Sequence, residues 1–172
     1  MIGGKMYITI NTDAAIDANG VGYYAYWIKG DNHIEKKAGQ LKTKPRDSTE
    51  AEMMAIVNAL HAAIKNREFF KTDIVVFNTD STGAIHAFEH RKNINTKYSG
   101  VRQEFDRTTS SLKQTIKFKH VKGHTKGNTP REHINNWCDQ AMRQLYRADV
   151  SHRETAKKQI KWKATEVANK NN

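Results

Sequence analysis

The sequence predicts an α/β fold in which a mixed sheet of five strands is flanked by helices. Three observations predict it. The first 40 residues contain three consecutive β-type runs, two later short runs also have strand character, and two long segments carry apolar residues at helical spacing. The chain has 172 residues, enough to bury one core, and fits a single domain with an appendage.

The N-terminal part predicts a three-stranded antiparallel meander. Residues 6–12 alternate in the manner of a strand. Asn19 and Gly20 form a turn signal that leads into a β-rich run over residues 20–29. Residues 30–32, Gly-Asp-Asn, predict a hairpin turn, after which residues 33–40 return along the second strand.

A long helix is predicted to follow Pro45 and to end near Asn66, because its apolar residues recur at helical spacing. These residues are Met53, Ile56, Val57, Leu60 and Ile64. Two overlapping capping boxes compete at its start. Asp47 can cap with Glu50 three residues on, or Thr49 can cap with Glu52.

The second half alternates strands and helices. We expect a compact buried strand over 73–79, a short helix over 81–88, a polar and basic loop over 89–97, a helix over 98–112 and a strand over 115–121. A loop rich in Gly, Thr, Asn and Pro, residues 122–130, then precedes a long helix over 131–146.

The composition changes at Ser151, which forms another candidate capping box with Glu154. From residue 151 onward the chain carries six Lys or Arg against two Glu, a net charge of +4. We therefore predict two parts, a domain over 1–150 and a basic amphipathic C-terminal helical extension over 151–172.

The whole chain is strongly basic, with a net charge of +11 and a pI near 9.7. Such an excess favours nucleic acid or an anionic membrane as partner, although a merely solvated basic surface is the simpler alternative. No stretch approaches the roughly 18 apolar residues of a membrane span, and the N-terminus lacks signal-peptide features. The single cysteine, Cys138, excludes an internal disulfide framework. We expect a cytoplasmic protein without membrane contact.

Four acidic residues lie in settings that favour chemistry: Asp13, Glu52, Asp80 and Asp139. Asp13 and Asp80 follow β-type runs, and the carboxyl ends of strands are where α/β sheets place their sites. Glu52 shares a helical face with apolar residues and should point towards the sheet. Carboxylate oxygens suit Mg²⁺, and several acids together can hold two ions beside a phosphate. In a basic protein, this set predicts phosphodiester chemistry on nucleic acid.

Each acid also has a purely structural alternative. Asp13 can be a turn residue, Glu52 can belong to a capping box, and Asp80 can cap the helix that follows it. Asp139 can pair with Arg143 one helical turn later.

His124 lies in the loop before the last long helix, where an imidazole can move protons or assist product release. A solvated loop histidine is the alternative. A zinc site made of His120, His124 and Cys138 is disfavoured, because only one thiol is present and no compact ligand pair accompanies it.

Five segments resemble, in order, the motifs of the type 1 ribonuclease H family. They are NTDAA (11–15), STEAEMMAIVNAL (48–60), NTDSTGAI (78–85), HVKGHT (120–125) and NNWCDQA (135–141), and the resemblance spans about residues 6–147. It implies a five-stranded mixed sheet of order 3-2-1-4-5 and two Mg²⁺ or Mn²⁺ ions. It also implies endonucleolytic hydrolysis of the RNA strand of RNA–DNA hybrids, leaving 5′-phosphate and 3′-hydroxyl ends.

Carried over by motif, the resemblance assigns catalysis to Asp13, Glu52, Asp80, His124 and Asp139, of which the four acids would hold the metal ions. Ala14 replaces a usual glycine, and Ser48 and Thr49 replace an Asn-rich stretch, although hydroxyls can still bond a ribose 2′-OH. A short basic loop stands in place of the long basic handle of some members. The residues we expect to contact substrate are Ala14, Ser48, Thr49, Arg91, Lys92, Lys97 and Asn135.

Two other functions are weighed against a nuclease. A non-catalytic nucleic-acid-binding module on the same fold is the main alternative, but a pure binder would gain by removing the four acids. A junction resolvase or integrase is disfavoured by the three-strand opening and by the VKGH loop. We expect a monomer that binds hybrids mainly through their phosphates, with an affinity that falls steeply as the salt concentration rises.

Overall fold

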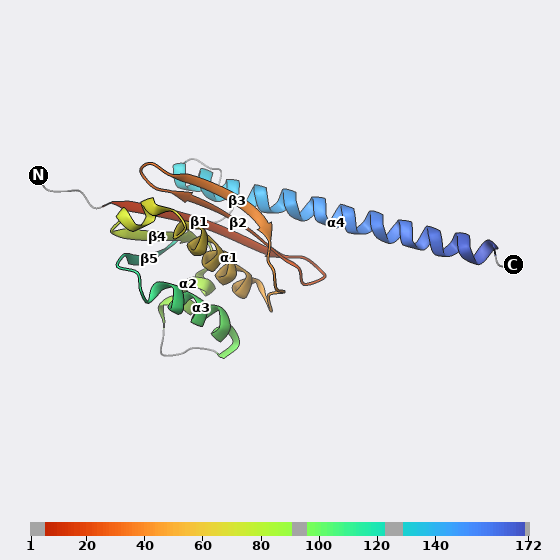
Figure 1. The fold of residues 1–172 in the computed structure, drawn as a ribbon, viewed down its shortest axis with the longest axis horizontal. Helices are drawn as coiled ribbons and strands as arrows, with labels where there is room; N and C mark the ends of the chain where they lie inside the picture. Colours follow the sequence, from red (N-terminus) through yellow and green to blue (C-terminus); the bar gives the residue numbers. More distant parts are fainter. Residues whose placement is uncertain (1–5, 91–95, 123–128, 171–172) are drawn as a thin grey trace, which may run out of the picture.

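A computed structural model of the chain describes residues 6–90, 96–122 and 129–170, with side chains described as far as residue 159 except at Thr96 and Arg131. One five-stranded sheet lies at its centre, and helices cover both of its faces (Figure 1). The predicted α/β class with a mixed sheet is confirmed.

The sheet has the order β3-β2-β1-β4-β5. Its first three strands form the predicted antiparallel meander, and β4 and β5 add in parallel on the other side of β1. The strands are β1 (Tyr7–Ile16), β2 (Gly22–Lys29), β3 (Ile34–Gln40), β4 (Ile74–Thr79) and β5 (Thr115–His120).

The turn between β1 and β2 is fixed by Asp17. Its carboxylate accepts hydrogen bonds from the backbone N–H groups of Asn19 and Val21, both at 2.8 Å. Gly20 adopts a φ of +76°, which glycine tolerates at little cost. The turn predicted from Asn19 and Gly20 is therefore present, and it also brings Asp17 beside the last long helix.

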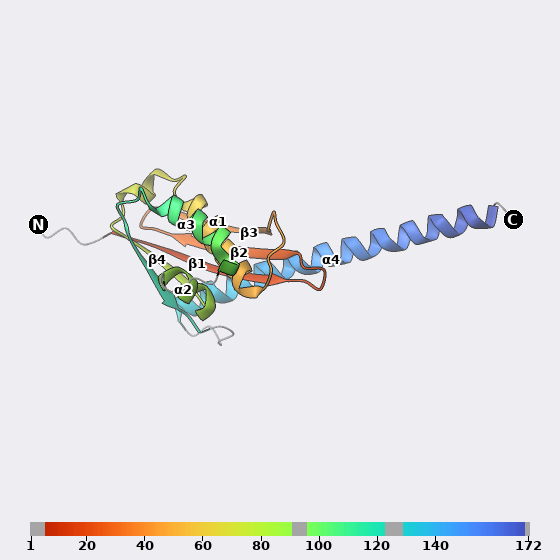
Figure 2. The ribbon, with the colours of Figure 1, turned by 90° about the horizontal axis from the view of Figure 1, so that it is seen from below.

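The helices form two layers. α1 (Ser48–Ala63), α2 (Thr82–Glu89) and α3 (Ser99–Thr109) lie on one face of the sheet, and α4 (Pro130–Lys170) lies on the other (Figures 1 and 2). Two short 3₁₀ helices, η1 (Arg67–Lys71) and η3 (Thr96–Tyr98), complete the described elements. η1 was not predicted, since five residues are too few for a periodic signal.

Alternation along the strands sends side chains into two cores. Ile8 and Ile10 pack with α1 and its neighbours, whereas Tyr23 and Ala25 pack with Cys138 of α4. The predicted apolar stripe of α1 is buried at Met53, Ile56, Val57 and Leu60. The two faces thus hold α1 and α4 at fixed positions against the same strands.

The start of α1 settles which capping box is used. The Asp47 side chain accepts the Glu50 N–H at 2.9 Å, and Glu50 Oε2 accepts the Arg46 N–H at 2.6 Å. Glu52 takes no part in capping. It is therefore available to the sheet side of the helix.

The last helix differs from the prediction. α4 is a single helix of 41 residues, so the break and capping box expected at Ser151 are wrong. Ser151 lies within the helix, where its carbonyl accepts the Thr155 hydroxyl at 3.0 Å. No Pro or Gly interrupts residues 131–170, and extending an existing helix avoids the cost of a new nucleus. The division at residue 150 into domain and extension stays a prediction.

None of the helices in the described ranges combines the length and the apolar character that crossing a bilayer requires.

Gly22 opens β2 where there is no room for a side chain. A Cβ there would lie 2.5 Å from Leu41 Cδ1 and 3.0 Å from Pro45 Cδ, in the segment that leads into α1. We predict that Gly22→Ala lowers the free energy of unfolding by about 1–3 kcal/mol through overpacking, as measured by urea denaturation.

Gly100 provides the matched control, since it lies in α3 and a Cβ there would meet nothing within 4 Å. Gly100→Ala should be neutral or stabilise by roughly 0.5–1 kcal/mol. Equal stabilities of the two variants would contradict the packing described at the start of β2.

Candidate active site

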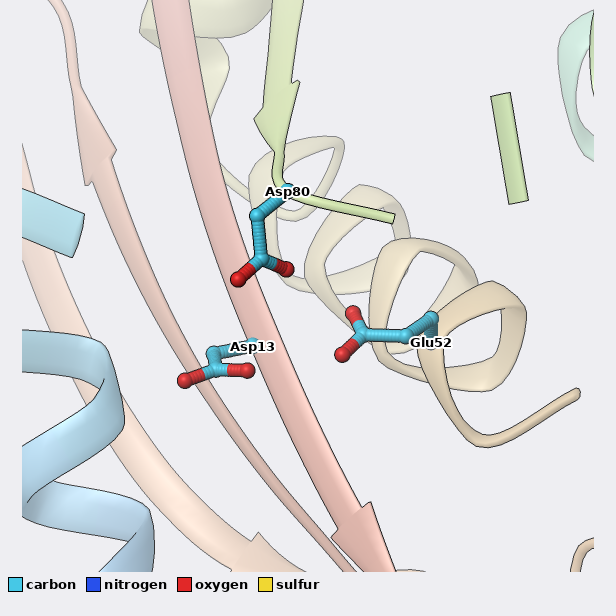
Figure 3. A group of neighbouring side chains, drawn as sticks. All are labelled: Asp13, Glu52 and Asp80. Atoms are coloured by element: carbon cyan, nitrogen blue, oxygen red, sulfur yellow. The ribbon is translucent and has the colours of Figure 1, made fainter. Parts of the chain in front are cut away.

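Three of the predicted acids meet in space. Asp13 from β1, Glu52 from α1 and Asp80, which follows β4, point towards one another (Figure 3). Each offers a carboxylate oxygen within 4.8 Å of the others. Asp13 and Glu52 are buried, and Asp80 is half-buried. Residues 67 positions apart in the chain therefore form one group of oxygen ligands.

Asp13 lies inside its strand, not at the end as predicted. β1 pairs with β4 only as far as Asn11 opposite Asn78, and then continues against β2, where Asp13 lies opposite Ala25. Because β4 has ended, Asp13 lacks a strand neighbour on that side. The cluster forms in this gap. Of the two strands, only β4 ends at the site, whereas both were predicted to do so.

Asp80 is not the cap of α2. Ser81 takes that role, since its Oγ accepts the Ala84 N–H at 3.1 Å. The Ser81 N–H in turn donates to Thr79 Oγ1 at 3.1 Å. The neighbouring hydroxyls satisfy the start of the helix, which leaves the Asp80 carboxylate to the cluster.

The backbone of Ala14 joins two of the acids. Its N–H donates to Asp13 Oδ1 at 2.9 Å and to Glu52 Oε1 at 3.0 Å. The other oxygen of Glu52, Oε2, is buried and accepts no hydrogen bond in the described part of the chain. A buried oxygen without a donor is costly, and a cation held between these acids would satisfy it.

Burial and mutual repulsion make it unfavourable for all three carboxyl groups of the cluster to be ionised at once. Burial, followed by the charges of Asp80 and Asp139, raises the pKa of Asp13 to about 7. Burial, followed by the charges of Asp13 and Asp80, raises the pKa of Glu52 well above its ordinary value. Near neutral pH the group therefore retains protons, and a divalent cation is the natural counter-charge that would displace them.

Asp139 faces the same cleft from α4. The cleft has a volume of about 410 Å³ and is lined by all four predicted acids together with Ala14, Ala15, Ile16, Met142, Arg143 and Tyr146. Asp139 lies outside the tight group of three. Its Oδ1 accepts a hydrogen bond from Arg143 Nε at 2.6 Å, which is the structural alternative foreseen for it. The two interpretations hold together, because its charge also raises the pKa of Asp13.

The predicted substrate residues are placed unequally. Ala14 lines the cleft, Ser48 is exposed, and Thr49 is half-buried against Gly83 of α2. Lys97 forms an ion pair with Asp47, the cap of α1. Asn135 is buried, and its Oδ1 accepts no hydrogen bond from the described residues; its contact with substrate stays a prediction.

His124, Arg91 and Lys92 lie outside the described residues, so their roles also stay predictions.

Arg143 was considered only as a partner of Asp139, yet it is the one cationic side chain that lines the described cleft. Its spacing of four residues from Asp139 on a helix was the available signal. Met142 and Tyr146 give the cleft an apolar wall, and nothing in the motifs singled them out.

The family model of RNase H matches residues 5–147. This chain belongs to the RNase H family. The predicted family and its enzyme class, ribonuclease H, are thereby confirmed, and the observed strand order agrees with the expectation drawn from the resemblance.

Solved structures with the same fold are distant in sequence. RNase H1 from the archaeon Halobacterium salinarum is 17% identical with a TM-score of 0.60, over 80% of this chain and 98% of that one. LC11-RNase H1 in complex with an RNA/DNA hybrid is 13% identical with a TM-score of 0.60, over 81% and 99%. An N-terminal RNase H domain from Mycobacterium tuberculosis is 14% identical with a TM-score of 0.58, over 84% and 99%. No curated protein matches the chain.

The raised pKa of Asp13 makes a prediction about stability without metal. In the folded state the Asp13 carboxyl keeps its proton up to about pH 7, whereas in the unfolded chain it loses that proton near pH 4. The free energy of unfolding therefore falls as pH rises through this interval. Asp13→Asn removes the titrating group. In EDTA we expect the variant to be more stable than the parent at pH 7.5, by on the order of 2 kcal/mol, with the difference shrinking towards pH 4.5.

Urea denaturation across this pH range measures the effect. Asp31→Asn, in the exposed turn between β2 and β3, is the matched control and should follow the parent. Parallel stability curves for Asp13→Asn and the parent would contradict the strained cluster.

Proposed function

We propose that this protein hydrolyses the RNA strand of RNA–DNA hybrids with the help of two divalent ions, Mg²⁺ or Mn²⁺, and leaves 5′-phosphate and 3′-hydroxyl ends. The observation that carries the proposal is the buried cluster of Asp13, Glu52 and Asp80, with Asp139 facing the same cleft. Family membership supports it. A hybrid bound to a structural neighbour, LC11-RNase H1, is consistent with the substrate.

The residues fit a divalent cation. All four side chains offer carboxylate oxygens, the donor type that Mg²⁺ and Mn²⁺ prefer. Glu52 Oε2 is buried without a donor, and the pKa of Asp13 is raised by burial and by its acidic neighbours, both of which a bound cation would relieve. When bound, two ions would activate an attacking water and stabilise charge on the leaving oxygen.

The chain itself positions these groups. The Ala14 N–H orients Asp13 and Glu52 together, and the pairing of β1 with β2 fixes Asp13 beside the end of β4. Arg143 restrains Asp139 and places a guanidinium at the cleft. A fixed cation there would attract the phosphate of a substrate that the four acids alone would repel.

Recognition of RNA would lie near the start of α1. The exposed Ser48 and the half-buried Thr49 carry hydroxyls four and three residues before Glu52, about one turn away on the same helix. A ribose 2′-OH is what distinguishes RNA from DNA, and a hydroxyl can bond it. Lys97, on the Asp47 ion pair beside this helix start, would add a phosphate contact. His124 would move protons from its loop. We further propose a cytoplasmic monomer.

A cleavage assay tests the proposal. The full chain with a titration of Mg²⁺ or Mn²⁺ should cut a fluorescent RNA–DNA hybrid, but leave DNA duplex, RNA duplex and a DNA junction intact. We predict that Asp80→Asn lowers the cleavage rate by about a hundredfold or more, while hybrid binding persists because a negative charge has been removed beside the phosphates.

Asp31→Asn is again the matched control, since it removes an exposed acid far from the cluster and should cleave as the parent does. A clean preparation that binds the hybrid but leaves it uncut with either ion would support a non-catalytic binding module instead. End-labelled products report the 5′-phosphate and 3′-hydroxyl directly.

A further inference from the structure

α4 continues far beyond the part of the chain that the family shares. The family match ends at residue 147, whereas the helix runs on to Lys170. Figures 1 and 2 show this stretch extending away from the sheet in both views. At 1.5 Å per residue, the helix beyond residue 147 is about 35 Å long.

A polar clamp fixes the helix where it leaves the body. The Arg153 guanidinium binds Asp17 Oδ2 at 2.5 Å, Asp149 Oδ2 at 2.9 Å and the Tyr23 hydroxyl at 2.7 Å. The Asp17 side chain is only 1% exposed and is held by two turn amides. Asp17 and Tyr23 belong to the β1–β2 hairpin that also carries Asp13. The clamp therefore fixes the direction in which α4 leaves the body relative to the acidic cluster.

The side of α4 that faces the cleft continues outward as a cationic row. At 100° per residue, Arg147, Lys157 and Lys158 lie within about 60° of Arg143 around the helix axis. All three are exposed, and none of their side chains has a hydrogen bond or ion pair with another described residue. Glu154 is the one acid on this side between them. The row (Arg147, Lys157 and Lys158) therefore presents three cations against one acid.

We propose that the cationic row of α4 binds the phosphate backbone of the RNA–DNA duplex beyond the cleft. The inference rests on the proposed function, because it takes the duplex to be seated at the acidic cluster. Lys157 lies about 21 Å along the helix from Arg143, a distance that corresponds to roughly six base pairs at 3.4 Å per pair. The row thus gives the enzyme contacts that only a longer hybrid can make.

The charge of the row decides between occupants. A polyanion is complementary to exposed cations that lack partners in the described protein, and counterion release drives such binding. A second copy of this chain would bring like charges together along the row. Among the described side chains of residues 151–159, Ala156 is the one apolar side chain, so this stretch has no apolar seam against which a second helix could pack.

The test compares two double variants of the full chain. Lys157→Ala with Lys158→Ala removes two charges from the row. His152→Glu with Gln159→Glu changes the net charge by the same amount on the opposite side of the same helix, at exposed positions. Both are made with Asp80→Asn so that the hybrid is not consumed. Fluorescence anisotropy then gives affinity for a hybrid of about 24 base pairs and one of about six, across a salt series.

We expect the lysine variant to bind the long hybrid about tenfold more weakly at low salt, with a salt slope shallower by about two. Its affinity for the short hybrid should match that of Asp80→Asn alone, and so should both affinities of the control. When Asp80 is restored, Lys157→Ala with Lys158→Ala should cleave saturating hybrid at the same maximal rate as the parent. An unchanged salt slope, or equal weakening by the control, overturns the inference. So does sedimentation that shows a dimer lost on Lys157→Ala with Lys158→Ala.

The two proposals fail separately. If the parent leaves hybrids uncut while the lysine variant still loses the two salt-dependent contacts, catalysis is refuted and the row stands. If the parent cuts hybrids and the lysine variant binds the long hybrid as tightly as the control does, the row is refuted and catalysis stands. A DNA duplex of the same length, tested in parallel, distinguishes phosphate contacts from contacts specific to the hybrid.

Discussion

Hydrophobic packing holds three mutually repelling carboxylates together at the centre of this structure. Asp13, Glu52 and Asp80 lie within a few ångströms of one another, and Asp13 and Glu52 are buried away from the water that would screen their charges. Left to themselves, such groups separate or take up protons, and the raised pKa values of Asp13 and Glu52 express that tendency. The fold holds them together, so the site is prepared for a cation before any is bound.

The restraint comes from packing on both faces of the sheet. Met53, Ile56 and Leu60 anchor α1 against the sheet and so fix Glu52. Cys138 and Met142 anchor α4 and so fix Asp139 between them. Neither helix can relax away from the acids without exposing apolar surface. Hydrophobic burial on two sides thus opposes the electrostatic repulsion in the middle.

The sequence predicted the order of the strands and long helices, and it singled out the three acids that meet in the cluster, because both depend on local signals. The turn at Asn19 and Gly20, the periodicity of α1 and the strand before Asp80 are all short-range patterns. Glu52 was assigned to the sheet side of its helix by spacing alone, and the Asp47 cap removed its competing role.

Other features depended on contacts that no local pattern carries. Asp13 stays within β1 because β2 continues to pair with it after β4 has ended. The Ala14 amide joins two acids 39 residues apart in the chain. α4 passes through the capping signal at Ser151 because extending a helix needs no new nucleus and because Arg153 fastens it to Asp17 and Tyr23. These outcomes follow from tertiary structure, which overrides weak local preferences.

The number of protons that a divalent ion displaces measures the charge repulsion within the acidic cluster. Calorimetric titration of the full chain with Mn²⁺ at pH 6.5, in two buffers of different ionisation enthalpy, separates proton release from binding heat. We expect saturable binding with release of about one proton or more, because the pKa of Asp13 is about 7 and that of Glu52 is also raised. Absence of binding, or binding without proton release, would show that the acids do not form a protonated cation site.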